Sequence, residues 1–161
     1  MTPTMTRGLF ACLAAMALGA GLIPLKAQAQ PAAAQSIWDG VYTDAQAERG
    51  RGQYGQHCAV CHGPALEGSF VMPPLTGEFI ADWTGTSLAD LYDKIQTTMP
   101  LNAPGTLRPA NTADILAYLL KVNNFPAGQK ELGAAPGELG AISFDAIKPA
   151  APSARGRRGD K

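Results

Sequence analysis

The 161-residue chain has little that could hold a structural metal, with only three cysteines and two histidines. A structural zinc site needs four ligands. Cys12 lies in an apolar N-terminal stretch, and His57 directly precedes Cys58, which leaves no room for a tetrahedral set with Cys61 and His62. A disulfide between Cys58 and Cys61 would close a loop too short to restrict the unfolded chain much. The sulfurs of Cys58 and Cys61 are therefore expected to bind something other than zinc or each other.

The chain also has no excess of either positive or negative charge, with 13 Lys+Arg against 13 Asp+Glu. The charges are unevenly distributed. Residues 30–144 carry 6 bases and 11 acids, a net of 6 − 11 = −5, whereas residues 145–161 carry 5 bases and 2 acids. An acidic domain is a poor binder of the phosphate backbone, because nucleic-acid binding depends on Lys and Arg. The sequence therefore argues against nucleic acid as a partner.

Residues 1–29 are typical of a signal peptide for export. They comprise a short start with one positive charge, an apolar stretch over residues 8–25, and Ala27-Gln28-Ala29, which fits the small-x-small cleavage pattern. We expect cleavage after Ala29, which removes Cys12 and places the mature protein in the periplasm without a membrane span. The alternative is an uncleaved anchor, because the apolar stretch approaches the length that crosses a bilayer.

Three segments have the periodicity and caps of helices, and no segment alternates polar and apolar residues as a strand would. Thr43 and Ser87 are expected to cap helices over residues 44–57 and 88–99. A further helix is expected after Asn111. The sequence therefore predicts an all-α fold.

The domain boundaries follow from composition. We expect a flexible leader over residues 30–36, a helical domain over residues 37–132, and a Gly/Ala/Pro-rich basic tail over residues 133–161 that lacks the apolar residues to order itself. A domain this small, with short helices and long loops, buries a weak core. A large apolar cofactor would supply the missing interior.

The segment Cys58-Ala59-Val60-Cys61-His62 is the C-x-x-C-H sequence that attaches c-type haem. Two thiols at this spacing reach the two vinyl groups of one porphyrin, and the adjacent imidazole of His62 becomes an iron ligand. A thioredoxin-like redox pair would require strands and a β-α-β pattern. The sequence therefore predicts one haem c, bound covalently through Cys58 and Cys61, with its iron on His62.

Met99 is the favoured second iron ligand. It lies 99 − 62 = 37 residues after His62, between a helix and Pro100. A thioether there would raise the reduction potential and close the site to small molecules. Met72 competes, but a loop of ten residues from His62 leaves little chain to pass round the haem edge. The other alternative is that Met99 only completes the apolar stripe of its helix, as methionines commonly do.

Several motifs occur in the order found in the mono-haem class I cytochrome c family, which the chain resembles over about residues 42–125. They are Arg49-Gly50, Tyr54, the C-x-x-C-H segment, Pro73-Pro74-Leu75, Thr98-Met99-Pro100 and Asp114-Ile115 with Tyr118-Leu119. The resemblance implies a cytochrome c fold, with three to four short helices and long loops around one covalently bound haem.

The resemblance also implies roles for individual residues. Gly50 and Tyr54 would lie where the first and last helices cross. A helical glycine costs about 1 kcal/mol relative to alanine, which is reasonable where two backbones must approach closely. The carbonyl of Pro73 would accept the Nδ1 proton of His62, and Trp83 would donate its indole hydrogen to a haem propionate.

Flanking segments over residues 37–42, 104–107 and 124–128 are similar to cytochromes that accompany periplasmic quinoprotein (PQQ-type) dehydrogenases. This implies a carrier of single electrons between a donor, such as a quinoprotein dehydrogenase, and a respiratory acceptor. The alternatives are a haem-based binding or sensing protein with an open or labile sixth site, and a permanent cytochrome subunit of a dehydrogenase complex. No activated nucleophile or paired acid and base is evident, so we expect no independent enzyme and assign no catalytic residue.

Overall fold

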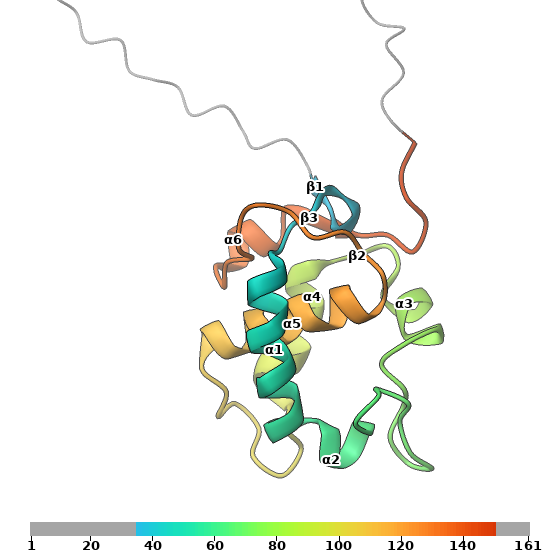
Figure 1. Cartoon of the computed structure of the whole chain (residues 1–161), viewed down its shortest axis with the longest axis vertical. Coiled ribbons are helices and arrows are strands. Elements are labelled where there is room, and N and C mark those ends of the chain that lie inside the picture. Colours follow the sequence, from blue (N-terminus) through green and yellow to red (C-terminus); the bar gives the residue numbers. More distant parts are fainter. Residues whose placement is uncertain (1–34, 151–161) are drawn as a thin grey trace, which may run out of the picture. The chain divides into compact units, whose positions relative to one another are not determined.

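The computed structural model describes residues 35–150 (Figure 1). The expected signal peptide with Cys12, most of the leader, and residues 151–161 of the tail lie outside the described residues. Within the described part of the chain, no helix has the length and apolar character needed to cross a membrane.

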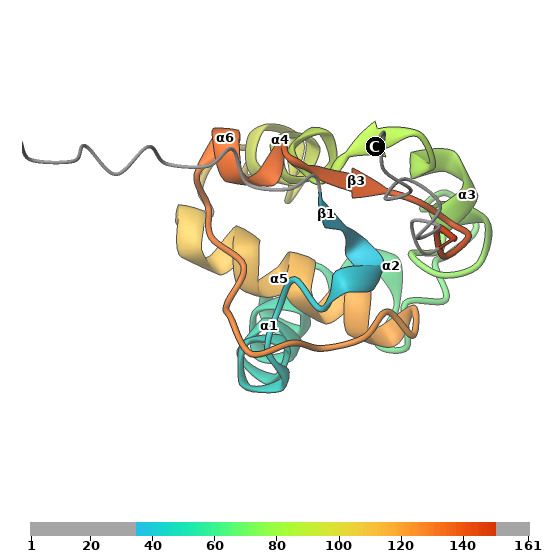
Figure 2. The same cartoon turned by 90° about the horizontal axis from the view of Figure 1, so that it is seen from above.

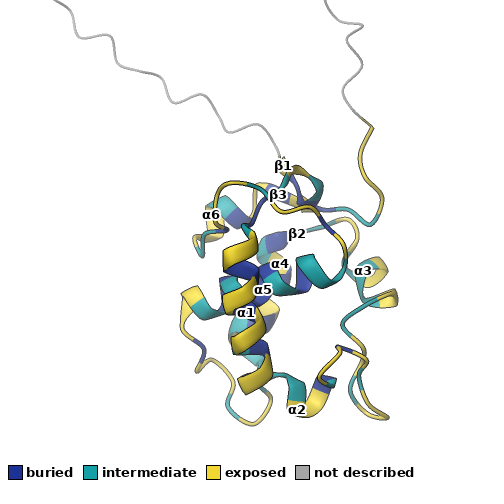
Figure 3. Ribbon diagram, viewed as in Figure 1, coloured by how far each residue is buried: buried dark blue, intermediate teal, exposed yellow. Residues whose placement is uncertain are grey.

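Helices dominate the described domain, as the sequence predicts. They are α1 (Asp44–His57), α2 (Ala59–His62), α3 (Glu78–Trp83), α4 (Leu88–Thr98), α5 (Pro109–Val122) and α6 (Pro136–Leu139), with a short 3-10 helix at Ile37–Asp39. The strands are β1 (Gln35–Ser36), β2 (Thr86–Ser87) and β3 (Ile142–Phe144). Buried residues concentrate where α1, α4 and α5 meet, whereas α2 and the loop that follows it are more exposed (Figure 3).

Two of the expected helix starts are confirmed. The Thr43 hydroxyl accepts a hydrogen bond from the Gln46 amide at 3.1 Å, and the Ser87 amide donates to the Asp90 carboxylate at 2.7 Å. The start expected after Asn111 is wrong, because α5 already begins at Pro109. Proline suits the first position of a helix, since its fixed φ matches the helix and no intrahelical partner is needed for its nitrogen.

The expected crossing of the first and last helices is confirmed. In Figure 1, α1 crosses in front of α5. A Cβ atom on Gly50 would overlap the backbone carbonyl of Asp114, so only glycine lets the two backbones come this close. One turn further along α1, the rings of Tyr54 and Tyr118 lie 5.4 Å apart. The Tyr54 hydroxyl donates to the Gly63 carbonyl at 2.7 Å, which ties the crossing to the end of α2.

The C-terminal segment corrects two expectations. Residues 133–150 are not disordered: they form α6 and β3, and Leu139, Ile142 and Phe144 are buried. Strands are also present, because β3 lies between β1, to which it is parallel, and β2, to which it is antiparallel (Figure 2). Few apolar residues occur here, but these three fill the space over α4, so the segment orders despite its Gly/Ala/Pro-rich composition.

This C-terminal segment also contacts the first residues of the described domain. The indole Nε1 of Trp38, a residue without a sequence-based role, donates to the carbonyl of Asp145 at 2.9 Å. The Trp38 ring packs edge-on against Phe125, with centroids 4.8 Å apart. The side chain of the buried Gln46 donates to the Leu132 carbonyl at 2.8 Å and accepts from its amide at 2.7 Å. The chain after α5 is thereby fixed against α1, and the domain extends beyond the boundary expected at residue 132.

Candidate haem site

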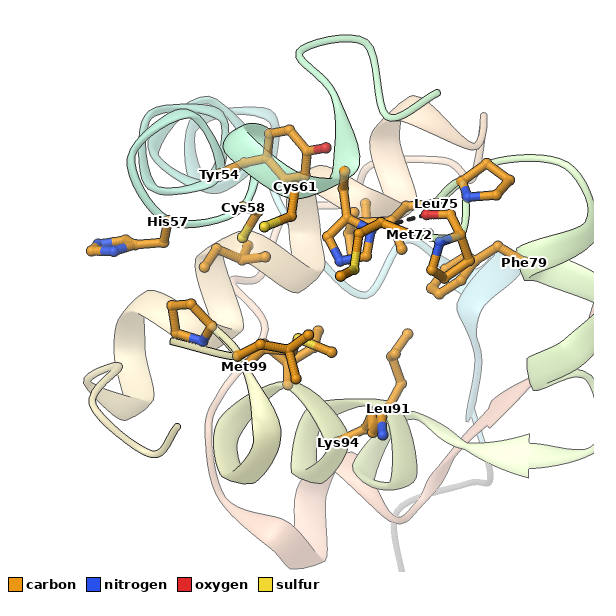
Figure 4. A pocket seen from close by; sticks show the side chains of 18 of the residues that line it. Tyr54, His57, Cys58, Cys61, Met72, Leu75, Phe79, Leu91, Lys94 and Met99 are labelled. Carbon is orange, nitrogen blue, oxygen red and sulfur yellow. Dashed lines mark hydrogen bonds between the residues drawn. The ribbon is translucent and has the colours of Figure 1, made fainter. Parts of the chain in front are cut away.

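One cavity of about 440 Å³ opens beside α2 and is bounded by α4, α5 and the segment from residue 72 to 83 (Figure 4). This volume is within the range of cofactor and ligand sites. Most of its lining is apolar. The apolar lining residues outside α2 include Leu75, Phe79, Leu91, Ile95, Ile115 and Leu119. The predicted site residues Cys58, Cys61, His62 and Met99 all line this cavity.

The end of α1 and the single turn of α2 place the two cysteines on the cavity. The amides of Cys61 and His62 both donate to the carbonyl of Cys58, at 3.0 and 2.9 Å. This turn puts residues three apart on the same side of the helix. Both cysteines are free thiols; burial, and to a lesser degree the neighbouring Cys61, raises the pKa of Cys58 to about 11. Cys58 is therefore protonated at neutral pH.

The imidazole of His62 is buried and fixed in orientation. Its Nδ1 donates to the backbone carbonyl of Pro73 at 2.9 Å, as the sequence predicts (dashed line in Figure 4). A carbonyl oxygen can only accept, so the proton resides on Nδ1 and the lone pair of Nε2 is free for a metal. The arrangement suits a histidine that binds iron through Nε2.

Met99 and Met72 both line the cavity, but they lie on different walls. Met72 directly precedes Pro73, whose carbonyl holds His62, so Met72 belongs to the histidine side. Met99 ends α4, where its amide donates to the Ile95 carbonyl at 3.1 Å. Figure 4 shows Met72 beside Cys61, and Met99 with Leu91 across the cavity. Only Met99 is thus placed to face a histidine ligand from the opposite side of a flat cofactor.

The polar lining residues are few. Trp83 lines the cavity, and its ring packs near Phe79 with centroids 6.3 Å apart. The propionate partner assigned to Trp83 stays a prediction. Asp82 and Lys94 also line the cavity, and the sequence reasoning missed both. Lys94 could have been found from its place beside Ile95 on the apolar stripe of its helix, whereas Asp82 carries no such signal.

Residues 45–119 match the protein-family model described as "Cytochrome C oxidase, cbb3-type, subunit III". The domain is a class I cytochrome c. The matched residues of this cytochrome run from the first turn of α1 nearly to the end of α5 and include all four predicted site residues.

A solved structure, the sulfane dehydrogenase SoxCD from Paracoccus pantotrophus, is similar to this cytochrome at 21% sequence identity. The similarity covers 76% of this chain and 68% of that chain, with a TM-score of 0.46. No curated protein sequence matches the chain significantly.

The cytochrome c domain implies haem c as the cofactor and electron transfer as the activity. The residues present fit that cofactor. The cavity combines two free thiols at the attachment spacing, an imidazole with a free Nε2, a thioether on the facing wall and an apolar interior.

Proposed function

We propose that this cytochrome carries single electrons between periplasmic proteins. One haem c would be attached through Cys58 and Cys61, with its iron between His62 and Met99. The observation that carries the proposal is the convergence of these four side chains on one apolar cavity. Haem c supplies a one-electron redox centre at its iron. The protein contributes the two ligands, the orientation of the imidazole and the exclusion of water.

A ligand on each side of the iron favours a carrier over a sensor. The hydrogen bond to Pro73 fixes His62, and the end of α4 fixes Met99, so neither ligand needs to move when the charge of the iron changes. A sensing protein with an open sixth site would have no use for a thioether at this position. The placement of Met99 therefore favours electron transfer.

The surface beside the cavity is suited to a protein partner. Phe70 is fully exposed and Val71 is 74% exposed, immediately before Met72. Val60 is 87% exposed and Leu101 is 55% exposed, and both line the cavity. Exposed apolar side chains gathered at one site mark a surface that other molecules contact. We place the docking site of the redox partner here.

The charge of this part of the chain indicates the chemistry of the partner. Residues 58–107 carry five acids and one base, Lys94, a net of 1 − 5 = −4. The ion pairs of the described residues lie elsewhere, within and between α1, α5 and the segment 130–138. The five acids of residues 58–107 therefore form no ion pair in the described domain, and one of them, Asp82, lines the cavity together with Lys94. A partner with basic groups around its docking site would complement them.

The similarity of residues 37–42 and 124–128 to cytochromes that accompany quinoprotein dehydrogenases supports such a dehydrogenase as the donor. The expected signal peptide supports the periplasm as the location. A permanent cytochrome subunit is the second candidate, which the full exposure of Phe70 favours. Extraction at high salt separates the two, because a subunit held by apolar contacts stays with its dehydrogenase and a free carrier is released.

The decisive experiment is expression of the full chain in a host that attaches haem c. The expected product is red, has the mass of the processed polypeptide plus one haem, and shows a reversible one-electron titration in its visible spectrum. Cys58→Ala with Cys61→Ala serves as the control and should lack covalent haem. Colourless wild-type protein with the mass of the bare polypeptide would contradict the proposal.

A further inference from the structure

The side chain of Gln96 joins three parts of the domain without lining the haem cavity. Its Nε2 donates to the backbone carbonyl of Leu107 at 2.8 Å. Its Oε1 accepts from the hydroxyl of the fully buried Thr112 at 2.8 Å, and from the hydroxyl of Tyr92 at 3.3 Å. Both donor and acceptor atoms of the amide are therefore satisfied. The amide links α4, the loop after it and the start of α5.

The loop over residues 100–107 depends on this contact. Its residues up to Thr106 are exposed or half-buried, and only Leu107 is buried. Within the loop, the Ala103 amide donates to the Pro100 carbonyl, and the Thr106 hydroxyl donates to the Ala103 carbonyl. Among the described residues, the Gln96–Leu107 bond is the one hydrogen bond that joins this loop to the rest of the chain.

The near end of the same loop is Met99. The helical spacing of α4 directs Leu91, Ile95 and Met99 to the cavity, and the Met99 amide bonds to the Ile95 carbonyl. The same turn of α4 therefore holds both ends of the loop. The carbonyl of Ile95 binds the amide of Met99 at the start of the loop, and the side chain of the next residue, Gln96, binds the carbonyl of Leu107 at its end. If the far end were released, the exposed loop would gain freedom and Met99 could leave the cavity more easily.

We infer that Gln96 is a positioning residue, which keeps Met99 at the haem iron by fixing the far end of the 100–107 loop. This inference rests on the proposed function, since it takes Met99 as the sixth ligand. Gln96 touches neither the cavity nor the iron site and acts only through the loop.

Two substitutions separate this role from simple packing. Gln96→Met keeps the length of the side chain and removes all three hydrogen bonds. At pH 8, Gln96→Glu keeps the acceptor for Thr112 and Tyr92, but a carboxylate cannot donate to the Leu107 carbonyl. The exposed Gln129, which has no hydrogen-bond partner within the described domain, supplies the matched controls Gln129→Met and Gln129→Glu.

The measurement is the affinity of imidazole for the ferric holoprotein, followed in the visible spectrum, since imidazole binds only where Met99 has left the iron. Both Gln96 variants should bind imidazole about tenfold more tightly than wild type, the factor that corresponds to one lost hydrogen bond. The Gln129 variants should match wild type. In a Met99→Ala background, Gln96→Glu should have no further effect, because the group it positions is gone.

Each contrary outcome has a distinct meaning. If Met99→Ala binds imidazole more tightly but Gln96→Glu behaves as wild type, the positioning role is wrong and the proposed ligation stands. If Gln96→Glu still raises the affinity in the Met99→Ala background, the residue does not act through Met99 and the inference is also wrong. If Met99→Ala itself leaves the affinity unchanged, the ligation by Met99 fails. Thermal unfolding of each holoprotein shows whether the variants are folded during the titration.

Discussion

The Nδ1 of His62 donates a hydrogen bond to the backbone carbonyl of Pro73 at 2.9 Å, so a loop eleven residues away orients the imidazole. The partner is a main-chain oxygen, and no side-chain substitution removes it directly. The orientation of the histidine is therefore controlled by whatever holds the loop over residues 72–74. The Ser69 amide donates to the Met72 carbonyl at 2.9 Å, and the adjacent Gly68 permits this close approach: its φ is +76°, and a Cβ atom there would lie 2.7 Å from the same oxygen.

Gly68→Ala should therefore disturb the iron site from a distance. We expect a loss of about 1–3 kcal/mol in stability, the usual cost of a side chain in such a strained backbone conformation. We also expect a higher reduction potential, because a histidine that loses its hydrogen bond becomes a weaker donor to ferric iron. Gly52→Ala, which meets no atom within 4 Å, is the control. Equal potentials in the two variants would contradict this coupling.

Met99→Ala should remove the absorption band of methionine-bound ferric iron and lower the reduction potential. Axial ligands tune haem potentials over a range of about 0.8 V, and a thioether lies toward the high end. Met72→Ala serves as the matched control, since Met72 lines the same cavity from the histidine side. Loss of the band in Met72→Ala, with its retention in Met99→Ala, would reverse the assignment.

Gly50→Ala should destabilise the holoprotein by about 2–3 kcal/mol, because the new methyl group overlaps the Asp114 backbone and must push α1 and α5 apart. Gly55→Ala lies on the same helix with nothing within 4 Å, and it should stabilise by about 0.5–1 kcal/mol. Denaturant titration of the two variants measures both effects. A neutral Gly50→Ala would mean that the helices do not cross at this residue.

Phe144→Ala should cost about 3–5 kcal/mol, the usual loss for a buried phenylalanine, because its ring is buried beside Phe125 with centroids 6.1 Å apart. Ile147→Ala, three residues later and 84% exposed, should stay within about 0.5 kcal/mol of wild type. Chemical denaturation of the holoprotein again gives the values. If the two variants were equally stable, the C-terminal segment would contribute nothing to the core.

The net negative charge of residues 58–107, which include most of the cavity lining, should make electron exchange depend on charge. Reduction by the cation hexaammineruthenium(II) should slow as salt is added, because salt screens the attraction. Reduction by the anion ferrocyanide should become faster under the same conditions. Replacing Glu78 and Asp82 together by lysine should diminish or reverse both trends, whereas Glu48→Lys on α1 should leave them nearly unchanged. Rates indifferent to salt with both reagents would remove electrostatic steering from the proposal.

Local sequence determined much of the site. C-x-x-C-H requires only that two thiols and an imidazole lie within one turn, and α2 supplies that turn. The caps at Thr43 and Ser87 act on amides within three residues, so α1 and α4 begin where the sequence predicts. Gly50 was singled out by the resemblance to class I cytochromes c, since the same helix also contains Gly52 and Gly55. The turn and the two caps depend on near neighbours in the chain, so they can be predicted directly from the sequence.

Other features were decided only by the tertiary structure. The strand β3 is ordered by hydrogen bonds to residues 35–36 and 86–87, and its composition gives no local sign of them. Loop length already favoured Met99 over Met72, but the walls of the cavity that the two residues occupy are set only by the fold, as is the link from Gln96 to the end of the following loop at Leu107. The physical reason is common to all three. Burial and hydrogen bonding between distant segments exist only once the chain has folded, so the residues that make them carry no pattern along the sequence.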